Sequence, residues 1–217
     1  MMRPAAIFLY SKTGIAAKPW ADAGIECWCV DTQHSIRRDK KEGLINYVWG
    51  DARSWAPPPG LDIVFVASFS PCTDVAGSGA RDFEKKGGIM LRDAIELFEA
   101  GRQCAKWSGA PYYCENSVGV LSSVPHIGKP DFYFHPHEFA GYAADPDSEA
   151  YTKKTCIWSG NGFIVPPKRN VDPILGSKMH LLPPSDDRAN ERSKTPSGWS
   201  NAVFQYNAPA TFRMAAA

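Results

Sequence analysis

A cysteine and a glutamate stand directly after two apolar runs, where both could act on one reacting group. Cys72 follows Pro71 behind the run of residues 62–67, and Glu115 follows the run of residues 111–114. A thiol can add to an electrophilic carbon, while a nearby carboxylic acid stabilises the negative charge that the addition creates. The pair therefore predicts covalent catalysis with acid assistance.

Polar residues also follow the earlier apolar runs. Residues 11–14 (Ser-Lys-Thr-Gly) follow the first run, and Asp31 and Asp51 come after the next two. In an open parallel sheet, ligands bind beyond the carboxyl ends of the strands. This set suits a nucleoside-containing cofactor, with its ribose hydroxyls at Asp31 and its exocyclic amine at Asp51.

The alternation of short apolar runs with helical patterns predicts an α/β fold with a mostly parallel, Rossmann-like sheet flanked by helices. Residues 125–150 and 165–198 are rich in proline and polar residues, so we expect loops there. The expected strands cover residues 5–10, 25–30, 47–49, 62–67, 111–114 and 155–158, and the expected helices cover residues 16–23, 89–107 and 198–206.

The bulk composition predicts one domain over residues 1–217. The chain is 44% hydrophobic and 22% charged, which is enough apolar material for a core. The net charge of +1 does not itself indicate a nucleic-acid partner, so any such surface must be a local basic patch. The candidate patches are Arg37, Arg38, Lys40 and Lys41; Lys153 and Lys154; and Lys168 and Arg169.

The cysteines and histidines show no metal-binding spacing. Six cysteines occur without a CxxC pair, so we expect reduced thiols in a cytoplasmic protein. His135 and His137 have no further ligands at useful spacing, and we interpret them as loop or core residues rather than a metal site. No stretch approaches the ~20 apolar residues of a membrane span, so no membrane partner is expected.

Taken in order, these pieces resemble the DNA (cytosine-5) methyltransferase family, particularly its short, phage-type members. The resemblance runs from about residue 7 to residue 206. It is carried by residues 9–14 (Leu-Tyr-Ser-Lys-Thr-Gly), 69–74 (Phe-Ser-Pro-Cys-Thr-Asp), 115–117 (Glu-Asn-Ser), 151–158 (Tyr-Thr-Lys-Lys-Thr-Cys-Ile-Trp) and 193–196 (Ser-Lys-Thr-Pro), with Asn-Ala-Val at 201–203.

The resemblance implies S-adenosylmethionine as cofactor and a flipped-out cytosine of DNA as substrate. Cys72 would add to carbon 6 of the base, Glu115 would engage nitrogen 3, and Lys153 and Lys154 would help to hold the cytosine. The residues expected to bind the cofactor are Tyr10, Ser11, Thr13, Gly14, Asp31, Asp51, Pro71 and Asn201.

The chain departs from the family pattern at several places. Lys12 stands where the family usually has glycine, Thr73 stands where longer members have glutamine, and Lys153 and Lys154 replace arginines. Only residues 159–192 separate the basic motif from the closing segment, which is too little for a separate target-recognition domain. We therefore expect short or relaxed sequence recognition, with affinity supplied mostly by phosphate contacts.

Three alternatives stay open. The substrate could be free or single-stranded cytidine nucleotides, because the recognition region is small. The chain could be a degenerate methyltransferase fold that binds nucleic acid or pairs with an active subunit. It could also be another Rossmann-like cofactor protein. For the methyltransferase we expect a monomer, while the sequence leaves an oligomer open.

Overall fold

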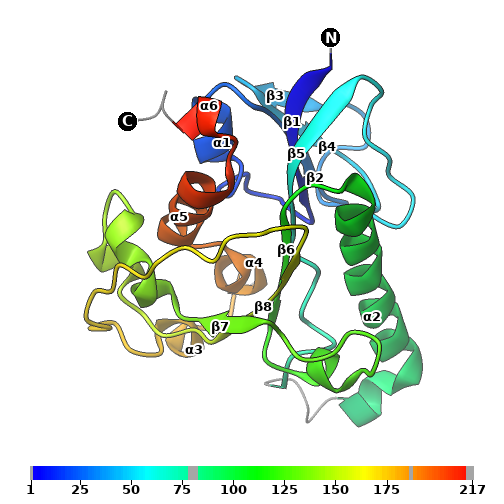
Figure 1. Ribbon diagram of the computed structural model, residues 1–217. Coiled ribbons are helices and arrows are strands. Elements are labelled where there is room, and N and C mark those ends of the chain that lie inside the picture. Colours follow the sequence, from blue (N-terminus) through cyan, green and yellow to red (C-terminus); the bar gives the residue numbers. More distant parts are fainter. Residues whose placement is uncertain (1, 78–82, 186–187, 214–217) are drawn as a thin grey trace.

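The computed structural model describes residues 2–77, 83–185 and 188–213, and its centre is one eight-stranded sheet (Figure 1). The strand order across the sheet is β3-β4-β2-β1-β5-β6-β8-β7. The strands are β1 (Arg3–Leu9), β2 (Glu26–Val30), β3 (Lys40–Glu42), β4 (Ile45–Val48), β5 (Leu61–Ser68), β6 (Tyr112–Ser117), β7 (Phe132–Phe134) and β8 (Thr155–Gly160).

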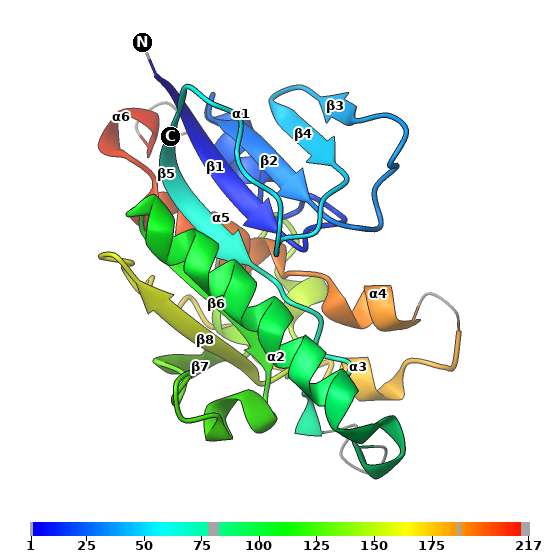
Figure 2. The same cartoon turned by 90° about the vertical axis from the view of Figure 1, so that its right-hand side faces the viewer.

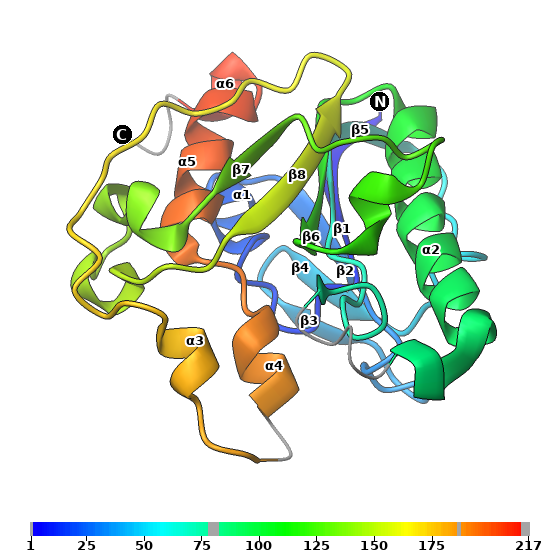
Figure 3. The same ribbon diagram turned by 90° about the horizontal axis from the view of Figure 1, so that it is seen from below.

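Five neighbouring strands run parallel, in the order β4, β2, β1, β5 and β6. At one edge of the sheet β3 pairs antiparallel with β4. At the other edge β8 pairs antiparallel with β6, and β7 pairs antiparallel with β8. The carboxyl ends of the parallel strands therefore lie along one edge of the sheet, which Figure 3 views from below. This confirms the predicted α/β architecture with a mostly parallel sheet, and the arrangement is compatible with a Rossmann-like fold.

Helices cover both faces of the sheet (Figures 1 and 2). The α2 helix lies on one face, and α1 and α5 lie on the other. The helices are α1 (Lys18–Asp22), α2 (Phe83–Ser108), α3 (Lys178–Leu181), α4 (Arg188–Ser193), α5 (Ser197–Asn207) and α6 (Ala210–Arg213), and the 3-10 helices are η2 (Val120–Ser123), η3 (Pro136–Glu138), η4 (Ala140–Tyr142) and η5 (Asp147–Glu149). Within these residues, no helix is both long and apolar enough to cross a membrane.

The central strand β1 shows why both faces must be covered. Its residues 5–9 are all buried, and their side chains alternate between two apolar clusters. Phe8 packs with Trp20 of α1, whereas Leu9 belongs to the cluster that contains Phe98 of α2. A strand buried on both faces appears in the sequence as a continuous apolar run, which is why these strands were predictable.

The loop predictions were wrong in two places. The β7 strand lies inside residues 125–150, where Phe134 stacks on Trp199 with ring centroids 4.4 Å apart. Two short helices, α3 and α4, lie inside residues 165–198. The edge strand β3 was also not predicted, because all three of its residues are exposed and carry no apolar pattern. Each of these elements is short and lies among proline and polar residues, so neither a helical nor an alternating pattern marks it in the sequence.

A buried carboxylate holds the start of α5. Glu149 accepts hydrogen bonds from the Ser197 hydroxyl (2.7 Å) and the Gly198 backbone N–H (2.9 Å), as well as from the Ser197 N–H. These backbone groups belong to the first turn of the helix, which has no internal partners for them. Gly198 is required here because a Cβ would lie 2.4 Å from the Phe139 carbonyl oxygen.

Glu149→Ala should lower the free energy of unfolding by about 1–3 kcal/mol, because it leaves buried donors unsatisfied. Glu149→Gln keeps an acceptor oxygen and should lose less. Urea unfolding of the purified variants measures the effect. Glu191→Ala, which removes an exposed carboxylate from α4, should change stability by only about 0.5 kcal/mol. Equal stability of Glu149→Ala and the parent chain would contradict the anchoring role.

Candidate active site

The predicted nucleophile, Cys72, lies in a tight turn just beyond the carboxyl end of β5. Its carbonyl oxygen accepts hydrogen bonds from the N–H groups of Val75 (3.2 Å) and Ala76 (2.9 Å), which close the turn. The Cys72 side chain is partly buried and packs against the cluster on the α2 face of the sheet. Its neighbour Pro71 is exposed. The thiol is thus positioned at the strand-end edge while keeping access to solvent.

The side chain of Asn116 joins this turn to β6. Its amide nitrogen donates to the backbone carbonyl of Ser70 and to the Ser70 hydroxyl, both at 3.0 Å. Both residues are buried, so these hydrogen bonds are shielded from competing water. The consequence is that the residues before Cys72 are held against the strand that carries Glu115.

A glycine allows a second attachment of the same turn. The Val120 N–H donates to the Val75 carbonyl oxygen at 2.9 Å, and Ala76 forms a bridge with Gly119. A Cβ on Gly119 would lie 1.8 Å from the Val75 oxygen. The Gly119 backbone is extended, so glycine is needed for this close approach rather than for its conformational freedom.

Glu115 lies within β6, not beyond its end as the sequence suggested. It is paired with Ile157 of β8 because β6 extends through Ser117. The carboxyl is buried, and its Oε2 has no hydrogen-bond partner. Oε1 lies 3.9 Å from the Lys153 ammonium, too far for a strong hydrogen bond. Burial raises the pKa of Glu115 and the Lys153 charge only partly opposes this, so the protonated form is favoured.

The two lysines of the basic motif have different surroundings. Lys153 is largely buried and faces Glu115. Lys154 is exposed, and its ammonium lies over the ring of Tyr133 in β7, 4.5 Å from the ring centroid. The structure therefore brings Lys153 to Glu115 and places the Lys154 ammonium over Tyr133 of the neighbouring strand β7.

The residues expected to bind a nucleoside cofactor lie after the adjacent strands β1, β2 and β4. Ser11 is buried, and its N–H donates to Val30 at 3.2 Å. Gly14 has a positive φ of 68°, and a Cβ there would lie 2.5 Å from the Tyr47 hydroxyl. Thr13 between them is exposed. The loop thus turns tightly beside the end of β2, as predicted.

The carboxylates of Asp31 and Asp51 differ in the hydrogen bonds that they already accept within the protein. Asp31 directly follows β2 and accepts the Gln33 N–H at 2.8 Å through Oδ1. Asp51 accepts the Arg53 guanidinium through both carboxylate oxygens, at 3.0 Å from Nε and 2.5 Å from Nη2. The Arg53 hydrogen bonds lower the pKa of Asp51. A ligand amine at Asp51 would have to share the carboxylate with Arg53.

Two expected cofactor residues are engaged within the protein. The Tyr10 hydroxyl donates to the Leu97 carbonyl of α2 at 2.6 Å, and the Tyr10 backbone has a positive φ of 58°. The Asn201 amide donates to the Tyr142 carbonyl of η4 at 2.9 Å. In the described residues, no hydrogen bond joins Asn201 to Tyr10, Asp31 or Asp51. The strand-end loop and Asp31 fit the nucleoside half of S-adenosylmethionine, while Asn201 has a structural contact instead.

The histidine pair directly follows β7, at the 3-10 helix η3. The rings of His135 and His137 are 5.7 Å apart, and His137 Nδ1 lies 3.1 Å from the Val171 carbonyl oxygen. Across residues 2–77, 83–185 and 188–213, no three His, Cys, Asp or Glu side chains gather in a way that could hold a metal ion. All six cysteines are free thiols.

Sequence reasoning missed three residues that shape the site. Asn116 and Gly119 hold the Cys72 turn, and Arg53 forms an ion pair with Asp51. Asn116 stood beside Glu115 in the recognised motif, and its type alone could have suggested a buried hydrogen-bonding role. The close approach at Gly119 had no signal in the sequence, since it depends on a partner 44 residues away.

Gly119→Ala should displace the Cys72 turn, because the added methyl group overlaps the Val75 oxygen. We expect stability to fall by about 1–3 kcal/mol and Cys72 to react faster with a thiol reagent, as measured by mass spectrometry of the labelled protein. Gly88→Ala is the matched control, since a Cβ there meets nothing within 4 Å. Unchanged labelling of Cys72 in Gly119→Ala would contradict this account of the turn.

The raised pKa of Glu115 has a defined effect on stability. Above the ordinary value of 4.5, the folded state binds more protons at Glu115 than the unfolded state, so this residue lowers stability as pH rises. Glu115→Gln should therefore stabilise the chain more at pH 8 than at pH 4, as measured by urea unfolding. An equal effect of Glu115→Gln at both pH values would contradict the buried, proton-holding carboxyl.

The comparisons with known proteins leave the family resemblance as an inference from motifs. A scan against protein-family models finds no matching family, and a search of the curated proteins finds no significant match.

Proposed function

We propose that this chain is a DNA (cytosine-5) methyltransferase, which transfers a methyl group from S-adenosylmethionine to carbon 5 of cytosine. The observation that carries the proposal is the tie between Asn116 and Ser70. It holds the Cys72 turn beside the strand on which Glu115 is buried with an unpartnered oxygen. A cysteine nucleophile and a carboxyl whose pKa is raised by burial are the two groups that cytosine methylation needs.

The chemistry follows from the weakness of carbon 5 as a nucleophile. The Cys72 thiolate adds to carbon 6, and the ring electrons move so that carbon 5 becomes enamine-like. The Glu115 proton at ring nitrogen 3 neutralises the negative charge that this addition would leave on the ring. After carbon 5 accepts the methyl group, a base removes its proton and the bond between sulfur and carbon 6 breaks.

The environment of Glu115 supports its role as the acid. A carboxyl exposed to water would be ionised at neutral pH and could not donate a proton to nitrogen 3. Burial in β6 favours the protonated form, and Lys153 lies close enough to stabilise the carboxylate once the proton has left. Carbon 6 is unreachable inside a duplex, so the target base must be flipped out or already unpaired.

The strand-end loop and the two acids support the choice of cofactor. S-adenosylmethionine would supply an electrophilic methyl group when bound. Asp31 would accept hydrogen bonds from the ribose hydroxyls, and residues 11–14 would approach the cofactor through their backbone. Asp51 would bind the adenine amine only if it shares its carboxylate with Arg53.

The small recognition region favours a second candidate substrate. The described part of residues 159–192 contains the end of β8, α3 and most of α4, with Ile174 and Leu181 exposed rather than packed in a core. This supports relaxed sequence recognition on DNA, and it equally favours single-stranded or free cytidine nucleotides. The two candidates share the same catalytic residues and differ only in the substrate.

A methyl-transfer assay with labelled S-adenosylmethionine tests the proposal. Duplex DNA, single-stranded DNA and dCMP should be offered separately, and we expect label in duplex DNA at carbon 5 of cytosine. Cys72→Ser should abolish transfer, and Glu115→Gln should slow it by about 10²–10⁴-fold. Cys104→Ser, at another partly exposed cysteine, should retain it.

The outcomes separate the candidates. Transfer to dCMP alone would replace DNA by free nucleotides as the substrate. Transfer that survives in Cys72→Ser would contradict the proposed mechanism. Bisulfite sequencing of the methylated duplex then gives the sequence context of the target cytosine.

A further inference from the structure

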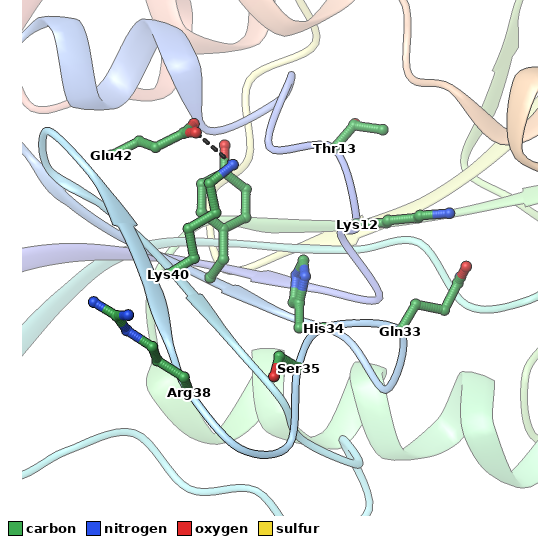
Figure 4. A pocket seen from close by; sticks show the side chains of 9 residues that line it. Lys12, Thr13, Gln33, His34, Ser35, Arg38, Lys40 and Glu42 are labelled. Atoms are coloured by element: carbon green, nitrogen blue, oxygen red, sulfur yellow. Dashed lines mark ion pairs between the residues drawn. The ribbon is translucent and has the colours of Figure 1, made fainter.

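A cationic pocket lies beside the proposed cofactor loop. It has a volume of ≈ 340 Å³ and opens between the loop after β1 and the residues that connect β2 to β3 (Figure 4). Lys12, Arg38 and Lys40 line it together with a single carboxylate, that of Glu42. Three cations against one carboxylate leave an excess of two positive charges, in a chain whose whole net charge is +1.

The one carboxylate that lines this pocket, that of Glu42, already forms an ion pair with Lys40. The Lys40 ammonium lies 2.5 Å from Glu42 Oε1, and it also lies over the Tyr47 ring at 5.3 Å from the centroid. In the described part of the chain, neither Lys12 nor Arg38 forms an ion pair. These two cations are therefore the ones available to an anionic ligand.

The arrangement of the two available cations favours an extended anion over a compact one. In Figure 4, Arg38 and Lys12 lie on opposite sides of the pocket and extend away from each other. A single phosphate or carboxylate is held by donors that converge on it. Charges spaced along a surface instead match a polymer that carries a phosphate at regular intervals.

The surroundings of the pocket fit such a polymer. Arg37, just before Arg38, and Lys41, three residues after it, are also exposed. His34 also lines the pocket, and its Nε2 lies 3.1 Å from the Ser11 carbonyl oxygen. That contact ties the β2–β3 connection to the loop that carries Lys12, so the two sides of the pocket are held in place relative to each other.

The pocket shares an edge of the sheet with Cys72. It is lined by residues that follow β1 and β2 and by residues of β3 and β4, which lie between one and four strands from β5. At about 4.8 Å per strand, this separation is roughly 5–20 Å. One strand of DNA carries a phosphate for about every 3.4 Å of helix axis. The pocket would therefore meet the backbone about two to six nucleotides from a base held at Cys72.

The basic pair Lys168 and Arg169 lacks these properties. Lys168 is paired with Glu138 at 2.5 Å, and the Arg169 guanidinium lies over the Tyr142 ring at 4.1 Å. Both hold their own segment against η3 and η4. The Lys12 and Arg38 side chains differ because no such partner occupies them.

We propose that the pocket between Lys12 and Arg38 binds backbone phosphates of the nucleic-acid strand that flanks the target base. The choice of nucleic acid as the polyanion rests on the proposed function. Contacts at this pocket would supply binding energy that the short region of residues 159–192 cannot.

Fluorescence anisotropy with a labelled DNA duplex tests the proposal at several salt concentrations. Lys12→Ala/Arg38→Ala should bind about tenfold more weakly or worse near 0.1 M salt, and the slope of log K against log salt should fall by about two. The matched control is Arg3→Ala/Lys106→Ala, which removes the same charge from exposed sites away from the pocket, at the start of β1 and in the last turn of α2. The control should bind like the parent chain.

Equal DNA affinity of the two double variants would overturn the proposal. So would a loss of S-adenosylmethionine affinity by calorimetry with DNA binding retained, since the pocket would then hold the cofactor. If the parent chain transfers methyl groups and Lys12→Ala/Arg38→Ala binds DNA as tightly as the control, the phosphate-binding role of the pocket is wrong and the proposed function still holds. If the parent chain transfers no methyl group but Lys12→Ala/Arg38→Ala binds DNA more weakly, the phosphate-binding role of the pocket is supported. The proposed function is then wrong.

Discussion

The hydrogen bonds from Asn116 to Ser70 are the interaction on which the candidate site depends. A turn after a strand has many conformations available, and fixing one of them has an entropic cost. Here a buried amide satisfies both the carbonyl and the hydroxyl of Ser70, and the bridge at Gly119 fixes the other end of the turn. Cys72 therefore lies in a turn that is attached to β6, the same strand that carries Glu115.

The sheet explains why the remaining functional residues gather nearby. Its five parallel strands end along one edge, and each contributes a polar residue there or just beyond. The buried faces under α1, α2 and α5 make this scaffold rigid, while the edge itself stays accessible. The anchor at Glu149 attaches the closing helix α5 to the same scaffold. The loops at this edge, which carry the candidate functional residues, are therefore attached to a buried sheet.

Much of this organisation was predictable, for physical reasons. Strands buried on both faces appear as continuous apolar runs, so β1 and β5 and the position of Cys72 beyond β5 followed from the sequence. The inclusion of Glu115 within β6 did not follow, because it depends on pairing with Ile157 of β8, 42 residues away in the sequence. The pairing of Asp51 with Arg53 and the different surroundings of Lys153 and Lys154 depend on side-chain placement, which no local pattern encodes. The strand β3 has no buried face at all, so hydrophobic patterning could not indicate it.

The central claim is that Cys72 forms a bond to carbon 6 of a cytosine. Incubating the full chain and S-adenosylmethionine with DNA that contains 5-fluorocytosine tests it directly, because fluorine cannot leave as a proton and the adduct persists. The account predicts a covalent complex in which mass spectrometry of the digested protein places the modified base on Cys72. An adduct on any of the other five cysteines, or no adduct with DNA that the parent chain methylates, would contradict it.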